Sequence, residues 1–189
     1  MGSLDTANAI VVYKIPAGDE EAPVQWREQN IRVYDLALSA DQERLAVVAE
    51  DQQSIIVYDF PARQRIAKFN YDGVKLTSLR ISMDSRAILV SMNPDQIREI
   101  SIDTGTLISE YKWHVQNEFM IRSSFGGASE TFVVTGSEDS KIYIWRRNGN
   151  AEKLHVLQGH QRGCVNAIAW NPGEPGMFAS AGDDASIRM

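Results

Sequence analysis

Two groups of side chains in this sequence have the chemical types of a hydrolase triad. Each contains a histidine, a hydroxyl residue and an aspartate in the same order: His114, Thr135 and Asp139, then His160, Ser180 and Asp184. In an acyl-transfer enzyme such groups act as base, nucleophile and orienting carboxylate. The histidine precedes the aspartate by 25 residues in the first group and by 24 in the second. A catalytic group has no need to recur in this way, so we interpret both groups as structural.

The structural interpretation gives each group a place in a small antiparallel sheet. A histidine ahead of the first strand would bond to an aspartate in the turn between the second and third strands. A hydroxyl on the second strand and an indole N–H on the third, here that of Trp145, would complete the chain of hydrogen bonds. Such a network satisfies buried polar groups and fixes the geometry of the sheet.

A second candidate feature is acidic. An acidic residue stands directly before each turn aspartate or its equivalent: Asp51, Glu138 and Asp183. These turns are expected to lie together on one rim of the molecule. A partly acidic rim could receive a basic segment of a partner protein through electrostatic complementarity. Turn residues are often simply solvated, however, and we favour solvation over binding for these three.

The remaining residues do not suggest a metal or a cofactor. Three histidines and Cys164 offer no ligand pair at short spacing, so no zinc site is expected. The stretch at 123–127 lacks the Lys-Ser/Thr element and the following helix of a phosphate-binding loop. We therefore expect a non-catalytic protein without a cofactor.

The composition narrows the partners and the compartment. The chain has 189 residues and a formal net charge of −6, from 25 acidic and 19 basic side chains. This balance argues against nucleic acid as a ligand, because such binding depends on clustered lysine and arginine. No apolar run approaches the ~18 residues that a membrane span needs, and no secretory signal is visible. One cysteine cannot form an internal disulfide, so we expect the cytoplasm and also the nucleus.

Short apolar strands that would position these groups recur along the chain. Positions that end a strand fall at intervals of 45, 42 and 45 residues: Tyr13, Tyr58, Ile100 and Trp145. Each of them follows an isoleucine by three residues. Turns rich in glycine, asparagine and aspartate divide each unit into four short strands, one of them expected over 119–125. A period of this size with four strands per unit predicts the blades of a β-propeller.

We therefore predict an all-β fold, a partial β-propeller that forms a single domain over residues 1–189. It has three whole four-stranded blades and incomplete blades at both ends: a fragment at 9–23, blades at about 24–70, 71–112 and 113–158, and a truncated blade at 159–189. The last unit, aligned on Asp184, ends one residue before its expected tryptophan. We therefore expect part of a larger ring, of about seven blades.

The end fragments could instead share one composite blade and close a ring of about four blades. That closure would need two competing third strands, one from each end of the chain, so we favour the open arc. An open arc leaves sheet faces uncovered, and self-association of the chain is then expected.

The last two units resemble the WD-repeat family. Gly159-His160 matches the opening of a repeat, the acidic pair at 138–139 matches its turn, and Ile142 to Trp145 match its third strand. Trp145 is followed by arginine where the family commonly has aspartate. The resemblance implies a propeller that binds other proteins.

A longer match covers residues 24–189. The segments at 124–127, 132–145, 157–160 and 170–184 resemble the C-terminal half of the WD-repeat scaffold subunits of GID/CTLH ubiquitin ligases. The two earlier blades lack the Gly-His opening and the tryptophan of a common repeat, and this also suits that subfamily. The resemblance implies a scaffold or adaptor that supports ubiquitin-dependent protein degradation. Its implied partners are the RING subunits, the LisH–CTLH subunits and the substrates of the ligase.

Two other functions remain open at this stage. A WD-repeat adaptor in an unrelated signalling or RNA-processing complex would share the same blade pattern, because a fold does not fix a function. An enzyme on a propeller would need a reactive cluster that does not recur from blade to blade. The triad-like cluster in this sequence does recur, so we favour a protein-binding role.

Overall fold

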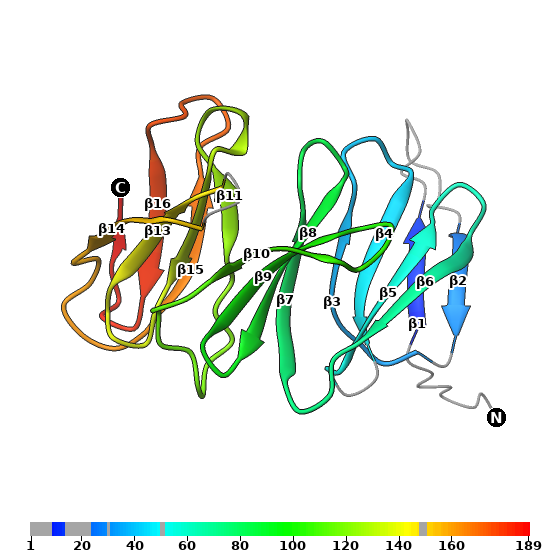
Figure 1. Ribbon diagram of the computed structural model, residues 1–189, viewed down its shortest axis with the longest axis horizontal. Helices are drawn as coiled ribbons and strands as arrows, with labels where there is room; N and C mark the ends of the chain where they lie inside the picture. The colour runs from blue at the N-terminus through cyan, green and yellow to red at the C-terminus, as the bar shows by residue number, and fades with distance from the viewer. Residues whose placement is uncertain (1–8, 14–23, 30, 50–51, 148–150) are drawn as a thin grey trace.

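The computed structural model describes residues 9–13, 24–29, 31–49, 52–147 and 151–189 (Figure 1). Within these ranges the chain forms seventeen β-strands and one short 3-10 helix, Ala128–Glu130. No helix in the described ranges is long and apolar enough to cross a membrane. The all-β class expected from the sequence is confirmed.

The strands form five antiparallel sheets, and strands that pair are neighbours in the sequence. An N-terminal pair contains β1 (Ala9–Tyr13) and β2 (Val24–Gln29). The first blade contains β3 (Val33–Leu38), β4 (Arg44–Ala49), β5 (Ser54–Asp59) and β6 (Gln64–Asn70). The second blade contains β7 (Lys75–Ile81), β8 (Ala87–Asn93), β9 (Gln96–Ser101) and β10 (Leu107–Tyr111).

The third blade contains β11 (Ser124–Gly126), β12 (Phe132–Gly136), β13 (Ile142–Arg146) and β14 (Lys153–Leu157). A partial blade contains β15 (Val165–Trp170), β16 (Phe178–Gly182) and β17 (Ile187–Arg188). Three successive four-stranded antiparallel sheets, flanked by smaller sheets, are the blades of a partial β-propeller.

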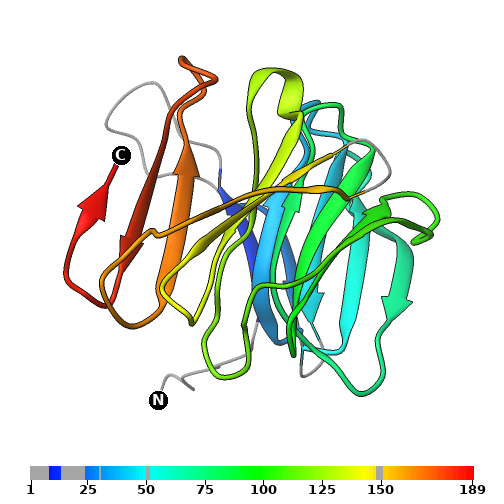
Figure 2. The same cartoon turned by 60° about the vertical axis from the view of Figure 1, so that its left-hand side comes forward.

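The blades follow one another across the molecule in chain order, from β1 and β2 at one end to β15 and β16 at the other (Figure 1). At two of the junctions the first strands of successive blades lie close together, since β3 packs against β7 and β11 packs against β15. The fourth strands, β6, β10 and β14, are the outer edges of the three whole blades. In the turned view of Figure 2 the strands of the partial blade lie side by side at the C-terminal end.

The middle strands are apolar because they are covered on both faces by neighbouring blades. β4 reads Arg-Leu-Ala-Val-Val-Ala and β5 reads Ser-Ile-Ile-Val-Tyr-Asp. Five of the six residues of β4 and four of the six residues of β5 are buried side chains of the hydrophobic core. Buried β-branched residues suit a strand packed on both sides. The outer strand β6 is mostly exposed, as expected for the edge of a blade. The core is therefore a series of apolar layers between blades.

The structure differs from the expected strands in two places. β2 pairs with β1, with Ile10 opposite Glu28, so the stretch at 24–29 does not join the sheet of the first blade. β11 begins only at Ser124, although a strand had been expected over 119–125. The chain ahead of Ser124 makes hydrogen bonds to turns of two blades in place of ladder bonds, as described below.

The outer strand of each whole blade has an irregular register with its neighbour. The register shifts between Val57 and Tyr58 where β5 meets β6, and between Ile144 and Trp145 where β13 meets β14. In the second blade the shift falls on the outer strand itself, after Leu107 of β10. Such bulges bend a strand and increase its twist.

The turns between the first and second strands of the first two blades share one construction. The hydroxyl of Ser39 donates to Asp41 Oδ1 at 2.6 Å, and the hydroxyl of Ser82 donates to Asp84 Oδ1 at 2.6 Å. Each carboxylate also accepts the backbone N–H two residues further on, at 3.0 and 3.1 Å. The serine hydrogen bond is the main reason that the pKa of each aspartate lies below its usual value.

Candidate interaction surface

The partial blade contains a complete hydrogen-bonded chain of the three expected side chains. His160 Nδ1 lies 2.8 Å from Asp184 Oδ1, and His160 Nε2 lies 3.0 Å from Ser180 Oγ. The hydroxyl of Ser186 also donates to Asp184 Oδ1, at 2.6 Å. This bond, the backbone N–H of Gln161 and the imidazole together hold the pKa of Asp184 far below its usual range. The carboxylate therefore stays ionised and orients the imidazole.

The geometry of this chain suits a structural role better than a nucleophilic one. Ser180 lies in the middle strand of the blade, opposite Ile168 and Arg188, and only 3% of it is exposed. His160 is 1% exposed. A nucleophile must reach a substrate carbonyl, and this hydroxyl is covered. The contacts instead satisfy buried polar groups where three segments meet.

The third blade places the same residue types without joining them. Neither ring nitrogen of His114 has a hydrogen-bond partner among the described residues, and the same holds for Thr135 Oγ1 and Trp145 Nε1. Trp145 is fully buried, and the His114 ring lies 5.9 Å from it at 85°. Burial lowers the pKa of His114 to about 4. The network expected for this blade is therefore not formed in this structure.

The turn aspartates of the two blades have different neighbours. Asp139 Oδ2 accepts the hydroxyl of Tyr143 at 2.8 Å and the ammonium of Lys141 at 3.0 Å. Aligned on the turn aspartates, the corresponding positions of the partial blade are Ser186 and Arg188. There the hydroxyl of Ser186 donates to Asp184 Oδ1 at 2.6 Å and Arg188 Nη2 lies 3.7 Å from Asp184 Oδ2, so Asp184 keeps donors at both positions and bonds to His160 as well.

Two of the three expected rim acids accept hydrogen bonds from other parts of the chain. Glu138 Oε1 accepts the backbone N–H groups of Asn117, Glu118 and Phe119 at 2.8, 2.8 and 3.0 Å. Burial works to raise the pKa of Glu138, but these three donors outweigh it and hold the pKa below its usual value. The carboxylate therefore fixes the shape of the connection between the second and third blades.

Asp183 has the equivalent role in the partial blade. Its carboxylate accepts the backbone N–H of Cys164 at 2.9 Å and the side-chain amide of Asn166 at 2.7 Å. These two bonds hold the pKa of Asp183 below its usual value. The third expected rim acid, Asp51, lies outside the described residues.

The connection at 112–123 is fastened from both neighbouring blades. Gln116 is fully buried, and its side-chain amide donates to Thr77 Oγ1 at 2.9 Å and to the carbonyl of Phe119 at 3.3 Å. Its backbone N–H donates to Asp95 Oδ1 at 2.5 Å. Asn93 donates to the carbonyl of the next residue, Asn117, at 3.1 Å. With Glu138 on the other side, this segment is held in one conformation.

This fastened segment presents large apolar side chains to solvent. Phe119 is 47% exposed and Met120 is 60% exposed. A groove of about 550 Å³ runs beside them. Residues of two turns and two blade connections line this groove: Gln52, Gln53, Gly73, Val74, Lys75, Thr77, Asn93, Pro94, Asn117, Glu118 and Met120. Exposed apolar anchors on a rigid segment beside a groove are features of protein-binding surfaces.

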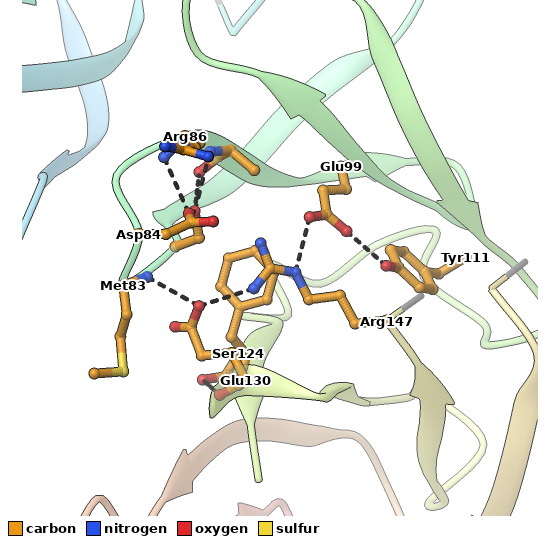
Figure 3. Close-up of polar contacts among 11 residues, drawn as sticks. Met83, Asp84, Arg86, Glu99, Tyr111, Ser124, Glu130 and Arg147 are labelled. Atoms are coloured by element: carbon orange, nitrogen blue, oxygen red, sulfur yellow. Dashed lines mark hydrogen bonds and ion pairs between the residues drawn. The ribbon is translucent and has the colours of Figure 1, made fainter. Parts of the chain in front are cut away.

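On the opposite rim, Arg147 joins the second and third blades (Figure 3). Its Nε donates to Glu99 Oε1 at 2.8 Å and its Nη1 donates to Glu130 Oε2 at 3.0 Å. The guanidinium lies 4.2 Å from the centre of the Phe125 ring. Glu99 also accepts the hydroxyl of Tyr111 at 2.7 Å. The side chains of Arg147, Glu99 and Glu130 are 14%, 4% and 13% exposed, so the network is largely desolvated.

Glu130 extends this network to an exposed turn. The same Oε2 atom that accepts Arg147 also accepts the backbone N–H of Met83 at 2.9 Å (Figure 3). Burial raises the pKa of Glu130, against the opposing effect of these two donors. Burial and the nearby carboxylate of Glu99 likewise raise the pKa of Tyr111. This network was not predicted from the sequence. Its one visible signal is the arginine pair after Trp145, where WD repeats commonly have aspartate.

No metal centre is found in the part of the chain that the structure describes, since no three histidine, cysteine, aspartate or glutamate side chains there could hold an ion together. Cys164 is buried as a free thiol, and burial raises its pKa to about 12. Such a thiol is inert as a nucleophile. The surface features of the described residues therefore suit binding of another protein.

The C-terminal units of the chain match a known protein family. The family described as "WD domain, G-beta repeat" matches residues 105–146 and 151–189. A solved structure, that of the computationally designed Ika4 protein, superimposes with a TM-score of 0.68 at 19% identity. The superposition covers 82% of this chain and 88% of that one. At this identity the likeness shows the fold alone.

Two relatives match nearly the whole chain. "GID complex subunit 7" of Schizosaccharomyces pombe is 35% identical over 172 residues, which cover 88% of this chain and 33% of the relative. "WD repeat-containing protein 26 homolog" of Arabidopsis thaliana is 32% identical over 186 residues, which cover 97% of this chain and 30% of the relative. The chain thus spans about a third of the length of these curated relatives. The repeats, the blades and these similarities together show that the chain belongs to the WD-repeat family of β-propeller proteins.

Proposed function

We propose that this chain is propeller sequence of a non-catalytic scaffold or adaptor subunit in a ubiquitin ligase of the GID/CTLH type. The observation that carries the proposal is the extent of the similarity to "GID complex subunit 7", which covers 88% of this chain. The WD-repeat match itself covers only 105–146 and 151–189. The similarity therefore extends into the earlier blades, which the WD-repeat family model does not match. A resemblance between repeats alone would not be expected to include those blades.

The chemistry of the described residues supports a binding role over a catalytic one. The hydroxyl of Ser180 is buried in a strand, and the thiol of Cys164 is buried as well. The expected ligase partners are RING subunits, LisH–CTLH subunits and substrates. The role of the complex would be ubiquitin-dependent protein degradation, in the cytoplasm and the nucleus.

We place the partner contact on the rim that carries the fastened segment. The carboxylates of Glu138 and Asp183 are occupied by internal hydrogen bonds. These two residues would therefore act by holding the segment and the turn in shape. Direct contact would fall to the exposed side chains of Phe119 and Met120 beside the groove.

Affinity purification tests the proposal directly. The full-length protein that carries this sequence would be tagged at its C-terminus at the native locus, and its partners would be identified by mass spectrometry. We expect stoichiometric recovery of RING and LisH–CTLH subunits. Recovery of some other stable complex without them would overturn the ligase assignment and would favour the unrelated adaptor.

A matched pair of variants tests the assigned rim. Met120→Asp places a charge on the proposed contact surface, whereas Met83→Asp places one on the opposite rim, at a side chain that is 73% exposed. We expect Met120→Asp to lose one or more partners and Met83→Asp to keep all of them. Equal recovery from both variants would contradict the rim assignment while leaving the ligase assignment intact.

A further inference from the structure

Trp113 combines an exposed aromatic side chain with an unusual backbone conformation. It is 71% exposed, more than any other tryptophan or phenylalanine in the described ranges. Its φ angle is +92°. A bulky residue in this left-handed region is an outlier, because its Cβ crowds the neighbouring backbone. Such a conformation persists only where the surrounding structure holds it, and outliers of this kind gather at functional sites.

The repeated turns of the blades do not account for this conformation. The other described residues that have a positive φ and are not glycine all lie in turns between two paired strands of one sheet: Gln42, Gln52, Arg63, Ser85, Asp95, Ser129, Glu130, Ser140, Ala151 and Ala185. Tight turns commonly need a residue in this region. Trp113 lies instead in the connection between the second and third blades, where the chain does not reverse between paired strands.

The partial blade shows that glycine suits this place in a repeat. Gly159 directly precedes the buried histidine of that blade, as Trp113 precedes His114. Gly159 is buried, its φ lies outside the left-handed region, and a Cβ added there would lie 2.7 Å from the side chain of Ile142. A glycine in place of Trp113 would be free of strain at either sign of φ. Folding alone therefore does not explain a tryptophan at this position.

A cation and a second apolar side chain accompany the indole. Lys153 Nζ is 5.6 Å from the centre of the Trp113 ring, and in the ladder of the third blade Lys153 is opposite Trp145. Val156 is 40% exposed and lies opposite Tyr143. The rings of Trp145 and Tyr143 stack on each other, so Lys153 and Val156 lie on the same face of the blade. We refer to Trp113, Lys153 and Val156 as the outer patch.

The ammonium of Lys153 is available to a carboxylate from outside. Lys153 is exposed and has no ion pair within the described parts of the chain, whereas Lys112 pairs with Glu110 at 2.5 Å. The ring of Trp113 compensates the ammonium only weakly, since a cation–π contact at an exposed site is a small effect. The outer patch therefore offers one positive charge beside an apolar surface made by the indole and Val156.

We propose that the outer patch is a docking site for a segment of another protein that carries an aliphatic side chain next to an aspartate or glutamate. The aliphatic group would lie on the indole and on Val156, and the carboxylate would pair with Lys153. An exposed tryptophan that becomes covered on binding is a common centre of binding energy. None of the three residues lines the groove beside Met120, so this is a second surface. The inference does not depend on the ligase assignment.

Zero-length crosslinking tests this site in the full-length protein, purified with the complex in which it occurs. A carbodiimide joins a lysine amine to a carboxylate only where the two are in direct contact. We expect a link from Lys153 to an aspartate or glutamate of another protein, next to an aliphatic residue, as mapped by mass spectrometry. A link from Lys153 to this same polypeptide would overturn the proposal. So would the lack of a link at Lys153 while other lysines of the chain are linked to partners.

The variant Trp113→Gly separates binding from folding. The glycine relieves the backbone strain, so the melting temperature should stay the same or rise. The yield of the Lys153 link should fall by at least about tenfold. Ile66→Ser is the control and should leave the yield unchanged, because Ile66 is a 47% exposed side chain on the outer strand of the first blade. Trp113→Asn replaces the glycine variant if that variant does not fold, since asparagine also tolerates a positive φ. An unchanged yield in either folded variant would overturn the proposal.

Discussion

Arg147 and Glu99 meet across the junction of the second and third blades, with Nε 2.8 Å from Oε1 and with little solvent access to either side chain. Arg147 lies just after the third strand of one blade, and Glu99 lies on the third strand of the other. The pair therefore connects corresponding parts of two successive repeats.

Replacing Arg147 should strongly destabilise the chain. Arg147→Met would leave Glu99 and Glu130 largely buried without their cation, which is expected to cost about 3–5 kcal/mol in the free energy of unfolding. The neighbouring Arg146 is the control, because its side chain is 51% exposed and lies 3.9 Å from Glu152. Arg146→Met should change the free energy by less than ~0.5 kcal/mol. Denaturant unfolding of both variants would check this, and equal effects would contradict the assigned role.

Glu130 should make the stability fall as the pH rises. Its pKa in the folded chain is raised, mainly by burial. The folded state therefore binds more protons than the unfolded state between the ordinary pKa of a glutamate and the raised value, and stability decreases through that window. Glu130→Gln removes the titration, so the variant should gain stability relative to the parent as the pH rises from 4 to 7. Parallel unfolding curves with a constant difference at all pH values would argue against it.

Trp145 should be among the most sensitive positions of the third blade. It is fully buried and packs on the rings of Tyr111, Tyr143 and His114. Trp145→Ala should cost about 3–5 kcal/mol in thermal or denaturant unfolding. Trp145→Phe should cost clearly less, because it retains a ring and loses an N–H that has no partner in the described structure. An unchanged melting curve for the alanine variant would exclude this packing.

Glu138 should control the order of the segment at 117–119. Glu138→Ala removes the acceptor of three backbone N–H groups. Hydrogen exchange of these amides should become faster by about tenfold or more, since each loses its bond. Glu118→Ala is the control, because this exposed side chain lies on the same segment and makes none of these bonds. Exchange rates that stay the same in the Glu138 variant would show that other contacts fix the segment.

Cys164 should resist thiol reagents in the folded chain. Burial raises its pKa to about 12, so the thiolate population at pH 8 is roughly a thousandfold lower than for an ordinary cysteine. Labelling with a chromogenic disulfide should be slow in buffer and complete, at one thiol per chain, in denaturant. Rapid labelling under native conditions would show that this part of the partial blade opens readily.

The fold could be predicted from the sequence because its signal is repeated. Ile97 and Ile142 stand at equivalent places in two blades, and both are buried in the structure as the period requires. The stretch at 24–29 was included in the first blade without a predicted strand, whereas in the structure it is β2 and pairs with β1. Trp26 in this strand packs with Tyr58 and Phe60, which lie far along the chain, and such contacts cannot be read from a local pattern.

The candidate surface was less predictable, because it depends on contacts between distant residues. The sequence located Glu138 in a turn, but three amides about twenty residues earlier decide what its carboxylate does. In the third blade the expected residue types are present, but the expected hydrogen bonds between them are not formed. Asp139 instead accepts hydrogen bonds from Lys141 and Tyr143. The repeated turn of Ser39 and Ser82 had a readable signal, a Ser-x-Asp motif at an interval of 43 residues, which was overlooked.

The irregular outer strands affect whether two copies of the chain can pair through their sheet edges. Each of β6, β10 and β14 meets its neighbour out of regular register. A free sheet edge can act as a template for the strand of another molecule, and a bulge that twists the edge away is one means of preventing this. At these edges an incoming strand would fall out of step after a few residues. Pairing of two copies of the chain through the outer strands of these three blades is therefore disfavoured.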